Sequence, residues 1–244
     1  MDREQYAIMY EVERAHWWYR AMRRNALGLM RRYLAPGRSY SVLDAGCGTG
    51  GTTIDLAQFG TVTGIDRSTD ALDYAWSRGL RRLVQASVEE LPFADATFDA
   101  WTCFDVLYHR AVAQEQRSIE EARRVLKPGG LAFFREPAFD WLRGAHDVGI
   151  HTERRFNLGP FANEIEAAGF YIEHATYGNS LLFPLAVLKR VLDRWLPGSP
   201  ADLSIPPGPI NAIFEAAVAL EGPLLSRTRL PLGLSVIVVA RKPV

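Results

Sequence analysis

Cysteine is scarce in this sequence of 244 residues, which contains only Cys47 and Cys103. Two cysteines cannot form the multiple-bridge framework of a small secreted domain, and they do not stand at metal-ligand spacing. An apolar run approaching the roughly 20 residues of a membrane-spanning helix is also missing, and acidic residues replace the apolar core of a signal peptide. We therefore expect a cytoplasmic protein in a reducing compartment, with no stable membrane insertion.

Net charge is absent too, because 28 Lys and Arg balance 28 Asp and Glu. A surface built throughout to bind nucleic acid needs a sustained positive field, so we expect no nucleic-acid partner. The balance hides a local asymmetry, since seven arginines lie between Arg14 and Arg38 and no acidic residue follows Arg14 before Asp44. This cluster suits an anionic ligand or, alternatively, a surface of acidic lipids.

Apolar, β-branched segments alternate with helical patterns from Tyr40 onward, which predicts an α/β fold with a mostly parallel sheet and helices on both faces. The predicted strands number seven and span residues 40–45, 61–66, 83–86, 98–103, 131–136, 171–176 and 234–240. The predicted helices span residues 2–34, 50–58, 69–77, 114–126, 161–168, 181–196 and 211–225.

Three regions follow from this order. Residues 1–38 form an N-terminal helical lid, residues 39–178 and 233–244 form the core, and residues 179–232 form a helical insertion between the last two strands. The insertion is rich in Leu, Phe, Val and Pro and contains a Pro/Gly-rich linker at 197–209. The sequence is equally consistent with three roles for the insertion: a cover over a hydrophobic substrate, a homodimer interface or an extension of the core.

The strongest local signal is the glycine-rich turn at residues 42–51, which leads from a buried strand into a helix. Gly46, Gly48 and Gly51 satisfy the G-x-G-x-x-G pattern of dinucleotide sites, and Asp66 lies twenty residues beyond Gly46 at the end of the next strand. Glycines let the backbone approach a ligand, while a carboxylate at that strand end is placed to bind ribose hydroxyls. The pattern indicates an adenosine cofactor.

Asp44 distinguishes between the candidate cofactors. It precedes the first glycine by two residues, where a carboxylate would repel a pyrophosphate. S-adenosylmethionine carries an ammonium and a sulfonium and no phosphate, so Asp44 favours it over NAD or FAD.

Several motifs in order resemble the class I S-adenosylmethionine-dependent methyltransferases over roughly residues 40 to 177. They are Asp44–Gly50, Asp66, Glu90–Phe93, Phe98–Asp99 and Leu126–Leu131. His16–Arg20 is similar to an N-terminal segment, containing His-Trp-Trp, of a bacterial subset of this family. The resemblance implies a Rossmann-like fold and a lid that covers the cofactor pocket.

The same resemblance implies a cofactor site assembled from the lid and from successive strand ends. Arg20 is the candidate partner of the cofactor carboxylate, and the tryptophans could screen the sulfonium, with plain helix packing as the alternative. Ser87 stands where such enzymes often have Asp, which changes the expected adenine contact. The candidate cofactor-binding residues are Trp18, Arg20, Asp44, Ala45, Gly46, Cys47, Gly48, Asp66, Arg67, Ser87, Val88, Cys103 and Asp105.

Acceptor chemistry is expected beyond the fourth and fifth strands, where three of the five histidines gather. His109, His146 and His151 are candidates for a general base, since an unperturbed histidine titrates near neutral pH. Each could instead serve only as a hydrogen-bonding loop residue. Tyr108, Arg154 and Arg155 are candidates for substrate binding, with caps and surface pairs as the alternative for the arginines. We expect no metal.

The sequence thus predicts in-line SN2 transfer of a methyl group to a small, partly hydrophobic biosynthetic molecule, most simply at oxygen. One alternative is a methyltransferase-like protein that binds the cofactor without methyl transfer, as a cyclase or regulatory module. A less favoured alternative is an NAD-dependent oxidoreductase.

Overall fold

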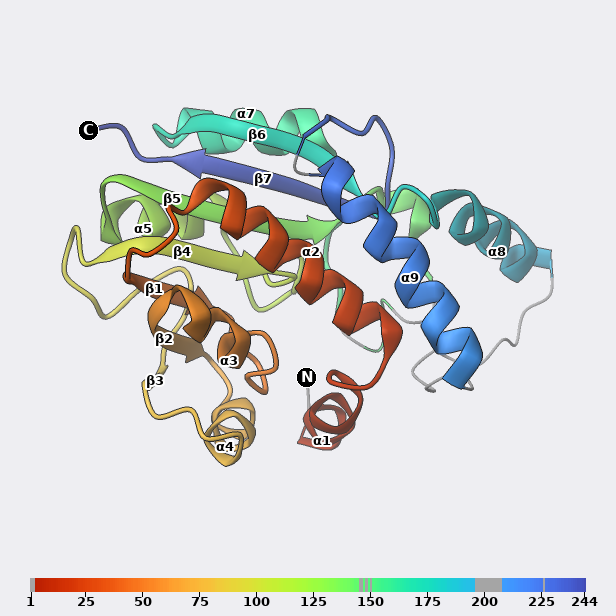
Figure 1. The fold of residues 1–244 in the computed structure, drawn as a ribbon, viewed down its shortest axis with the longest axis horizontal. Coiled ribbons are helices and arrows are strands. Elements are labelled where there is room, and N and C mark those ends of the chain that lie inside the picture. The colour runs from red at the N-terminus through yellow and green to blue at the C-terminus, as the bar shows by residue number, and fades with distance from the viewer. Residues whose placement is uncertain (1–2, 145–146, 148, 150, 196–207, 226) are drawn as a thin grey trace.

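The computed structural model describes residues 3–144, 147, 149, 151–195, 208–225 and 227–244 (Figure 1). Its strands are β1 (Tyr40–Ala45), β2 (Gly60–Asp66), β3 (Leu83–Gln85), β4 (Phe98–Phe104), β5 (Leu126–Pro137), β6 (Tyr171–Gly178) and β7 (Ser235–Arg241). Its α-helices are α1 (Arg3–Val12), α2 (Trp17–Tyr33), α3 (Thr53–Leu56), α4 (Thr69–Ser77), α5 (Glu115–Val125), α7 (Leu158–Ala167), α8 (Phe183–Trp195) and α9 (Gly208–Leu225). Two short 3-10 helices span Ala57–Phe59 and Asp140–Leu142.

The seven strands form one sheet in the order β3-β2-β1-β4-β5-β7-β6. The pairings from β3 through β5 are parallel, whereas β7 runs antiparallel to both β5 and β6. The predicted mostly parallel, seven-stranded sheet is confirmed. Parallel strands end at the same edge of a sheet, so the loops after β1, β2, β4 and β5 gather along one edge.

Both faces of the sheet are covered, as expected for a parallel sheet. Side chains of β5 alternate between the faces, with Phe134 packing in the cluster that contains Ile119 and Phe161 of α5 and α7. Phe133 packs on the other face with Leu27 and Met30 of α2. The core is therefore two hydrophobic layers separated by the sheet.

The N-terminal segment departs from the prediction of one helix over 2–34. It consists of α1 and α2, separated by a break at residues 13–16. His16 caps α2, since its Nδ1 accepts a hydrogen bond from the amide of Trp18 at 3.2 Å. The break turns α1 away from the line of α2 (Figure 1) and gives the two halves different neighbours.

The insertion contributes α8 and α9, which lie between β6 and β7 in the chain as predicted. α9 runs beside α2 (Figure 1), and the rings of Trp17 and Phe214 lie 5.1 Å apart at their contact. Most of the predicted linker at 197–209 lies outside the described residues. Within the described part of the chain, no helix has both the length and the apolarity needed to cross a membrane.

Candidate active site

The glycine-rich turn after β1 is held against β2 and the loop after β4. The amides of Gly46 and Cys47 donate to the carbonyl of Ile65 at 2.9 and 2.8 Å. Gly46 has a φ of +80°, and a Cβ built there would lie 2.3 Å from Cγ2 of Val106. Only glycine fits both requirements, so the turn keeps its backbone bare at the sheet edge.

Asp44, at the end of β1, is buried under this turn. Its carboxylate accepts hydrogen bonds from the hydroxyls of Thr53 at 2.6 Å and Thr102 at 2.8 Å, and so joins α3 to β4. Burial raises the pKa of Asp44 above its usual range, and the negative charge of Asp66 raises it further. Asp44 therefore acts as an anchor of the turn and as a source of negative potential.

Asp66 is only partly buried at the end of β2. It accepts hydrogen bonds from the amides of Gly48 at 3.0 Å and Ser68 at 2.9 Å, which fixes the carboxylate beside the turn. Burial raises the pKa of Asp66, and these backbone bonds oppose the rise. Tyr6 of α1 is buried next to it, and burial together with the charge of Asp66 raises the pKa of Tyr6 to about 12.

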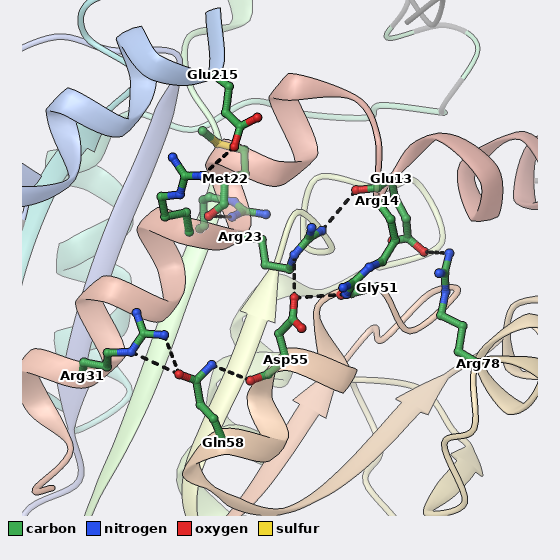
Figure 2. Close-up of polar contacts among 12 residues, drawn as sticks. Glu13, Arg14, Met22, Arg23, Arg31, Gly51, Asp55, Gln58, Arg78 and Glu215 are labelled. Atoms are coloured by element: carbon green, nitrogen blue, oxygen red, sulfur yellow. Dashed lines mark hydrogen bonds and ion pairs between the residues drawn. The ribbon is translucent and has the colours of Figure 1, made fainter. Parts of the chain in front are cut away.

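α1 is fastened to the glycine-rich turn through Glu13 and Arg78 (Figure 2). The carboxylate of Glu13 accepts from Thr49 Oγ1 and lies 2.5 Å from Nη2 of Arg78. Arg78 also donates to the carbonyls of Thr49 at 2.7 Å and Tyr10 at 2.5 Å, and its guanidinium lies 4.0 Å from the centre of the Tyr10 ring. α1 thus covers the turn directly.

Arg23 fastens the start of α2 to the same region (Figure 2). Its side chain donates to the carbonyl of Glu13 at 3.1 Å and pairs with Asp55 of α3 at 2.7 Å. Arg14 pairs with the same Asp55 carboxylate at 3.1 Å. The break between the two helices is therefore held by ion pairs to the helix that follows the glycine-rich turn.

Trp18 and Arg20 of α2, which were predicted to meet the cofactor, contact α9 in this structure, and their role in cofactor binding stays a prediction. Trp18 packs edge-on to Trp17 in the cluster that includes Leu182 and Val218, and Arg20 pairs with Glu215 at 3.1 Å. Tyr19 of the same helix is close enough to Glu13 and Asp105 for their charges to act on it. Burial and the charges of Glu13 and Asp105 raise the pKa of Tyr19 to about 12.

The loop after β4 begins at Asp105, which has a φ of +59°. Its carboxylate pairs with Arg135 of β5 through Nε at 3.1 Å and Nη2 at 2.5 Å. Glu136, fully buried, accepts from the amides of Val106, Leu107 and Tyr108 at 3.2, 2.9 and 3.1 Å. Burial raises the pKa of Glu136 to about 8, with a contribution from Asp105. Two acidic side chains thus fix the shape of this loop.

His109 and His151 meet beside this loop, with ring centroids 5.9 Å apart. Nδ1 of His109 accepts a hydrogen bond from the amide of Ala111 at 3.0 Å, and burial lowers the pKa of His109 to about 4. His151 has a φ of +57°. Burial raises the pKa of Tyr108, which precedes His109. His146 lies outside the described residues.

Arg154 and Arg155 are engaged within the chain. Arg154 pairs with Glu115 and donates to the carbonyl of Val112 at 3.1 Å. Arg155 binds Asp147 at 2.9 and 2.8 Å and donates to the carbonyl of Ala138 at 3.1 Å. Both guanidiniums join the segment after β5 to neighbouring loops, so substrate binding by them remains a prediction that would require an exchange of partners.

The remaining predicted cofactor residues lie near the same edge. Ser87 accepts from the amide of Glu89 at 3.2 Å, Val88 is buried, and Arg67 donates to the carbonyl of Ala111. Ala45 and the two cysteines are buried, and burial raises the pKa of both thiols well above the usual range. Cys47 and Cys103 therefore stay protonated packing residues.

Comparison with known proteins identifies the core. A sequence profile described as "Methyltransferase domain" matches residues 43–134, from the end of β1 to β5. Residues 43–134 therefore form a methyltransferase domain, and the sheet around it has the fold of the class I S-adenosylmethionine-dependent enzymes. The match begins at the glycine-rich turn, and it favours the methyltransferase interpretation of that turn over the dinucleotide one.

Individual relatives of this methyltransferase differ in their named reactions. The malonyl-[acyl-carrier protein] O-methyltransferase of Pseudescherichia vulneris is 33% identical over 146 residues, which cover 59% of this chain and 57% of that protein. The chain spans about half the length of the curated relatives it matches.

Two solved structures share the fold over nearly all of the chain. The [4+2]-cyclase SpnF has a TM-score of 0.60 and 26% identity, covering 93% of this chain and 83% of that one. The 1,6-didemethyltoxoflavin-N1-methyltransferase of Burkholderia thailandensis, solved with S-adenosylhomocysteine, has a TM-score of 0.58 and 21% identity, covering 99% and 87%.

The methyltransferase site fits the charge of the family's cofactor. Asp44 and Asp66 are close enough for the negative charge of Asp66 to raise the pKa of Asp44. A cationic ligand at this edge would reduce the repulsion between the two carboxylates. Gly48, with a φ of +53°, leaves its backbone open, since the nearest atom to a Cβ built there is Cε of Met9 at 3.7 Å. In the described residues no group of three or more His, Cys, Asp or Glu could hold a metal ion.

Sequence reasoning missed the contacts that fasten α1 to this methyltransferase site. Steps of three and four place Tyr6, Tyr10 and Glu13 on one face of the helix predicted over 2–34, but a continuous helix would wrongly extend that face to Trp17 and Arg20. Nothing in the local sequence indicated the role of Arg78, because it lies at the end of α4 and its partner Glu13 is 65 residues away in the chain. The position of Glu13, the last acidic residue before the arginine-rich segment, was the one clue to a buried ion pair.

Proposed function

We propose that this methyltransferase transfers the methyl group of S-adenosylmethionine to an oxygen atom of a small, partly hydrophobic molecule. When bound, the cofactor supplies an electrophilic methyl group on a sulfonium. Transfer from a sulfonium is an SN2 displacement, for which holding the nucleophile in line is most of the catalysis. Asp44, Gly46, Gly48 and Asp66 would hold the cofactor in this proposal.

One observation carries the proposal: the acidic, glycine-lined turn lies directly beside the loop that presents the acceptor candidates. Val106 touches the position that a Cβ of Gly46 would occupy, and Tyr108 and His109 follow within three residues. A cofactor on the turn and an acceptor on the loop would therefore be neighbours. Glu136 positions this loop through its three amide contacts, and Asp105 does so through Arg135.

His109 has a defined protonation state in this arrangement. With a pKa near 4 its ring is neutral at pH 7, and because Nδ1 accepts from Ala111 the proton sits on Nε2. The ring therefore presents a donor to an acceptor molecule, and it would serve as a base only after releasing the bond to Ala111. His151, whose ring is adjacent, is the second candidate for proton transfer.

A cavity between α2, α9 and the sheet has room for only about one water molecule, so its apolar wall supports a partly hydrophobic acceptor but the cavity would have to widen to bind one. Its wall is mostly apolar, with Met22, Leu29, Phe133 and Leu225 among the lining side chains. Asn25 also lines it, and neither side-chain atom of Asn25 finds a hydrogen-bond partner among the described residues. Arg135, which binds Asp105, stands at the same wall. The name of the malonyl-[acyl-carrier protein] relative also favours oxygen as the methylated atom.

The test is a transfer assay with S-adenosylmethionine labelled at the methyl group. Phenols, carboxylic acids, heteroaromatic amines and thiols of graded hydrophobicity serve as acceptors, and mass spectrometry locates the added methyl group. We expect label on the oxygen of apolar phenols or acids. Label confined to nitrogen or sulfur would contradict O-methylation.

A second candidate is cyclisation without methyl transfer, which the likeness to the [4+2]-cyclase favours. A cyclase needs no methyl group, so S-adenosylhomocysteine would sustain its turnover as well as S-adenosylmethionine does. A methyltransferase is inactive with S-adenosylhomocysteine. Incubating polyene substrates with each compound separates the two functions.

A further inference from the structure

Two helices of the insertion expose stripes of large apolar side chains. On and just before α8, Leu181, Leu185, Leu188 and Leu192 recur at steps of four and three, which places them on one side of the helix. On α9, Ile213, Leu220 and Leu224 are spaced by seven and four residues, which also places them on one side of the helix. Together with three neighbours they define the insertion face, whose members are 44–72% exposed: Leu181, Leu185, Leu188, Val191, Leu192, Ile210, Ile213, Leu220, Leu224 and Leu232.

The exposed side of α9 bears no charge. Its two charged residues, Glu215 and Glu221, are 7% and 1% exposed. Glu215 pairs with Arg20 and Arg24 of α2, at 3.1 and 2.6 Å, and Glu221 accepts from the amide of Leu181 at 3.2 Å. An 18-residue surface helix without an exposed charged side chain is unusual, since the outer face of such a helix is ordinarily polar.

Exposed cations surround the insertion face. Arginines of α2 lie on one side of α9, Lys189 lies on α8, and two further arginines follow the end of α9. The exposed members are Arg20, Arg24, Arg32, Lys189, Arg227 and Arg229. Among the described side chains of α2, α8, α9 and residues 227–232, no carboxylate is exposed. Although the chain as a whole has zero net charge, the exposed described charges near these apolar stripes are therefore positive.

The exposed apolar side chains and the nearby cations together favour one class of binding partner. Contiguous exposed apolar patches mark sites of interaction, and apolar helix faces bordered by Arg and Lys are typical of binding at the headgroup region of anionic lipids. A second copy of the chain would bring the same cations against each other, which repels. Nucleic acid would be matched in charge but would leave ten large apolar side chains without an apolar partner.

We propose that the insertion face docks on an anionic lipid surface, with the apolar stripes of α8 and α9 entering the headgroup region and the surrounding arginines pairing with phosphates. This goes beyond methyl transfer and does not depend on it, because lipid binding is measured without turnover.

Co-sedimentation of the full chain with vesicles tests the proposal. We expect binding to vesicles of phosphatidylglycerol and phosphatidylcholine in equal parts, weaker binding as salt rises, and little binding to pure phosphatidylcholine. Leu185→Gln with Leu220→Gln should lower the partition coefficient at least tenfold, since each leucine contributes about that much when buried. The matched control is Trp76→Gln with Tyr171→Gln, at two equally exposed positions on α4 and β6, which should change nothing.

The charge contribution is tested separately. Arg32→Gln with Arg227→Gln should lower binding to the anionic vesicles about fivefold for each cation removed. Arg81→Gln with Arg82→Gln, near β3, removes two exposed cations away from the insertion face and should have a far smaller effect.

Three results would overturn the proposal. One is equal binding to both kinds of vesicle, and another is binding that the leucine pair does not weaken. The third is absence of vesicle binding, whether or not the wild type sediments as a dimer. A dimer that the leucine pair dissociates would assign the insertion face to a second copy of the chain.

Discussion

At the carboxyl edge of the sheet, acidic side chains such as Asp44 and Glu136 are buried and bonded, whereas the insertion keeps its leucines exposed and its cations at the rim. The structure of the sheet edge depends on individual hydrogen bonds, because each carboxylate accepts from a particular amide or hydroxyl group. The insertion face, by contrast, is defined only by the apolar character of its exposed side chains and by their spacing along the helices. We therefore expect the edge to respond sharply to single substitutions and the insertion face to respond only when a partner is present.

The largest effect is expected at Gly46, where a side chain meets both an unfavourable φ and Val106. Gly46→Ala should lower the free energy of unfolding by about 3 kcal/mol, combining the cost of a left-handed residue with that of overpacking. Urea titration measures it. Gly37 is the matched control, because its φ is +76° with no atom within 4 Å, so Gly37→Ala should cost only about 1 kcal/mol. Equal losses would show that the contact with Val106 is irrelevant.

The next effect concerns cofactor affinity. Asp66→Ala removes the acceptor of the Gly48 and Ser68 amides as well as the proposed ribose contact, so the dissociation constant for S-adenosylmethionine should rise roughly 30-fold. Calorimetry measures it, and Asp73→Ala, an exposed carboxylate on α4, is the control. Unchanged affinity in the Asp66 variant would remove the ribose assignment.

A smaller effect is expected at His109. His109→Ala should lower turnover about tenfold with little change in cofactor affinity, as loss of one neutral hydrogen-bond donor predicts. Because the pKa of His109 is near 4, the pH profile of wild-type turnover should show no loss on this account between pH 8 and pH 5. A fall in wild-type turnover around pH 6.5 that is absent in His109→Ala would instead identify the ring as an ordinary titrating base.

The smallest effect is expected in the pH dependence of the free energy of unfolding. The native pKa of Glu136 is raised from 4.5 to about 8, so the native state holds a proton that the unfolded chain releases. The stabilising contribution is complete below pH 4.5 and is lost as pH rises through 8. Glu136→Gln should reduce this slope in urea unfolding measured across that range. A slope that Glu136→Gln leaves unaltered would mean that other buried carboxylates govern it.

The sequence predicted the sheet well because strands and helices of the core have local signatures. Three kinds of local signal locate these elements: β-branched runs, the glycine-rich turn and the Lys127–Gly130 segment that follows the end of α5. Each extends over only a few residues, and the predicted strand ends fall within a few residues of the observed ones. The exception is β5, which begins at Leu126 rather than 131, because Leu126 pairs with Phe98 before a register shift. Pairing across the sheet has no local signature.

The lid could not be predicted in the same way. Helical periodicity was continuous through residues 13–16, yet Thr49 and Arg78 capture Glu13 and His16 starts a new helix. Beyond the break, Trp18 packs with Trp17, Arg20 pairs with Glu215 of α9, and Tyr19 lies near Glu13 and Asp105. Asp44 was located correctly, but its two threonine partners come from α3 and β4 and could be seen only in three dimensions.

The central claim is that the acidic edge of the sheet binds a cationic adenosine cofactor. Calorimetric titration of the wild-type chain with S-adenosylmethionine, S-adenosylhomocysteine and NAD tests it most directly. We predict saturable binding of both sulfur compounds and none of NAD, whose pyrophosphate would face Asp44. Binding of NAD together with failure of both sulfur compounds would contradict the claim.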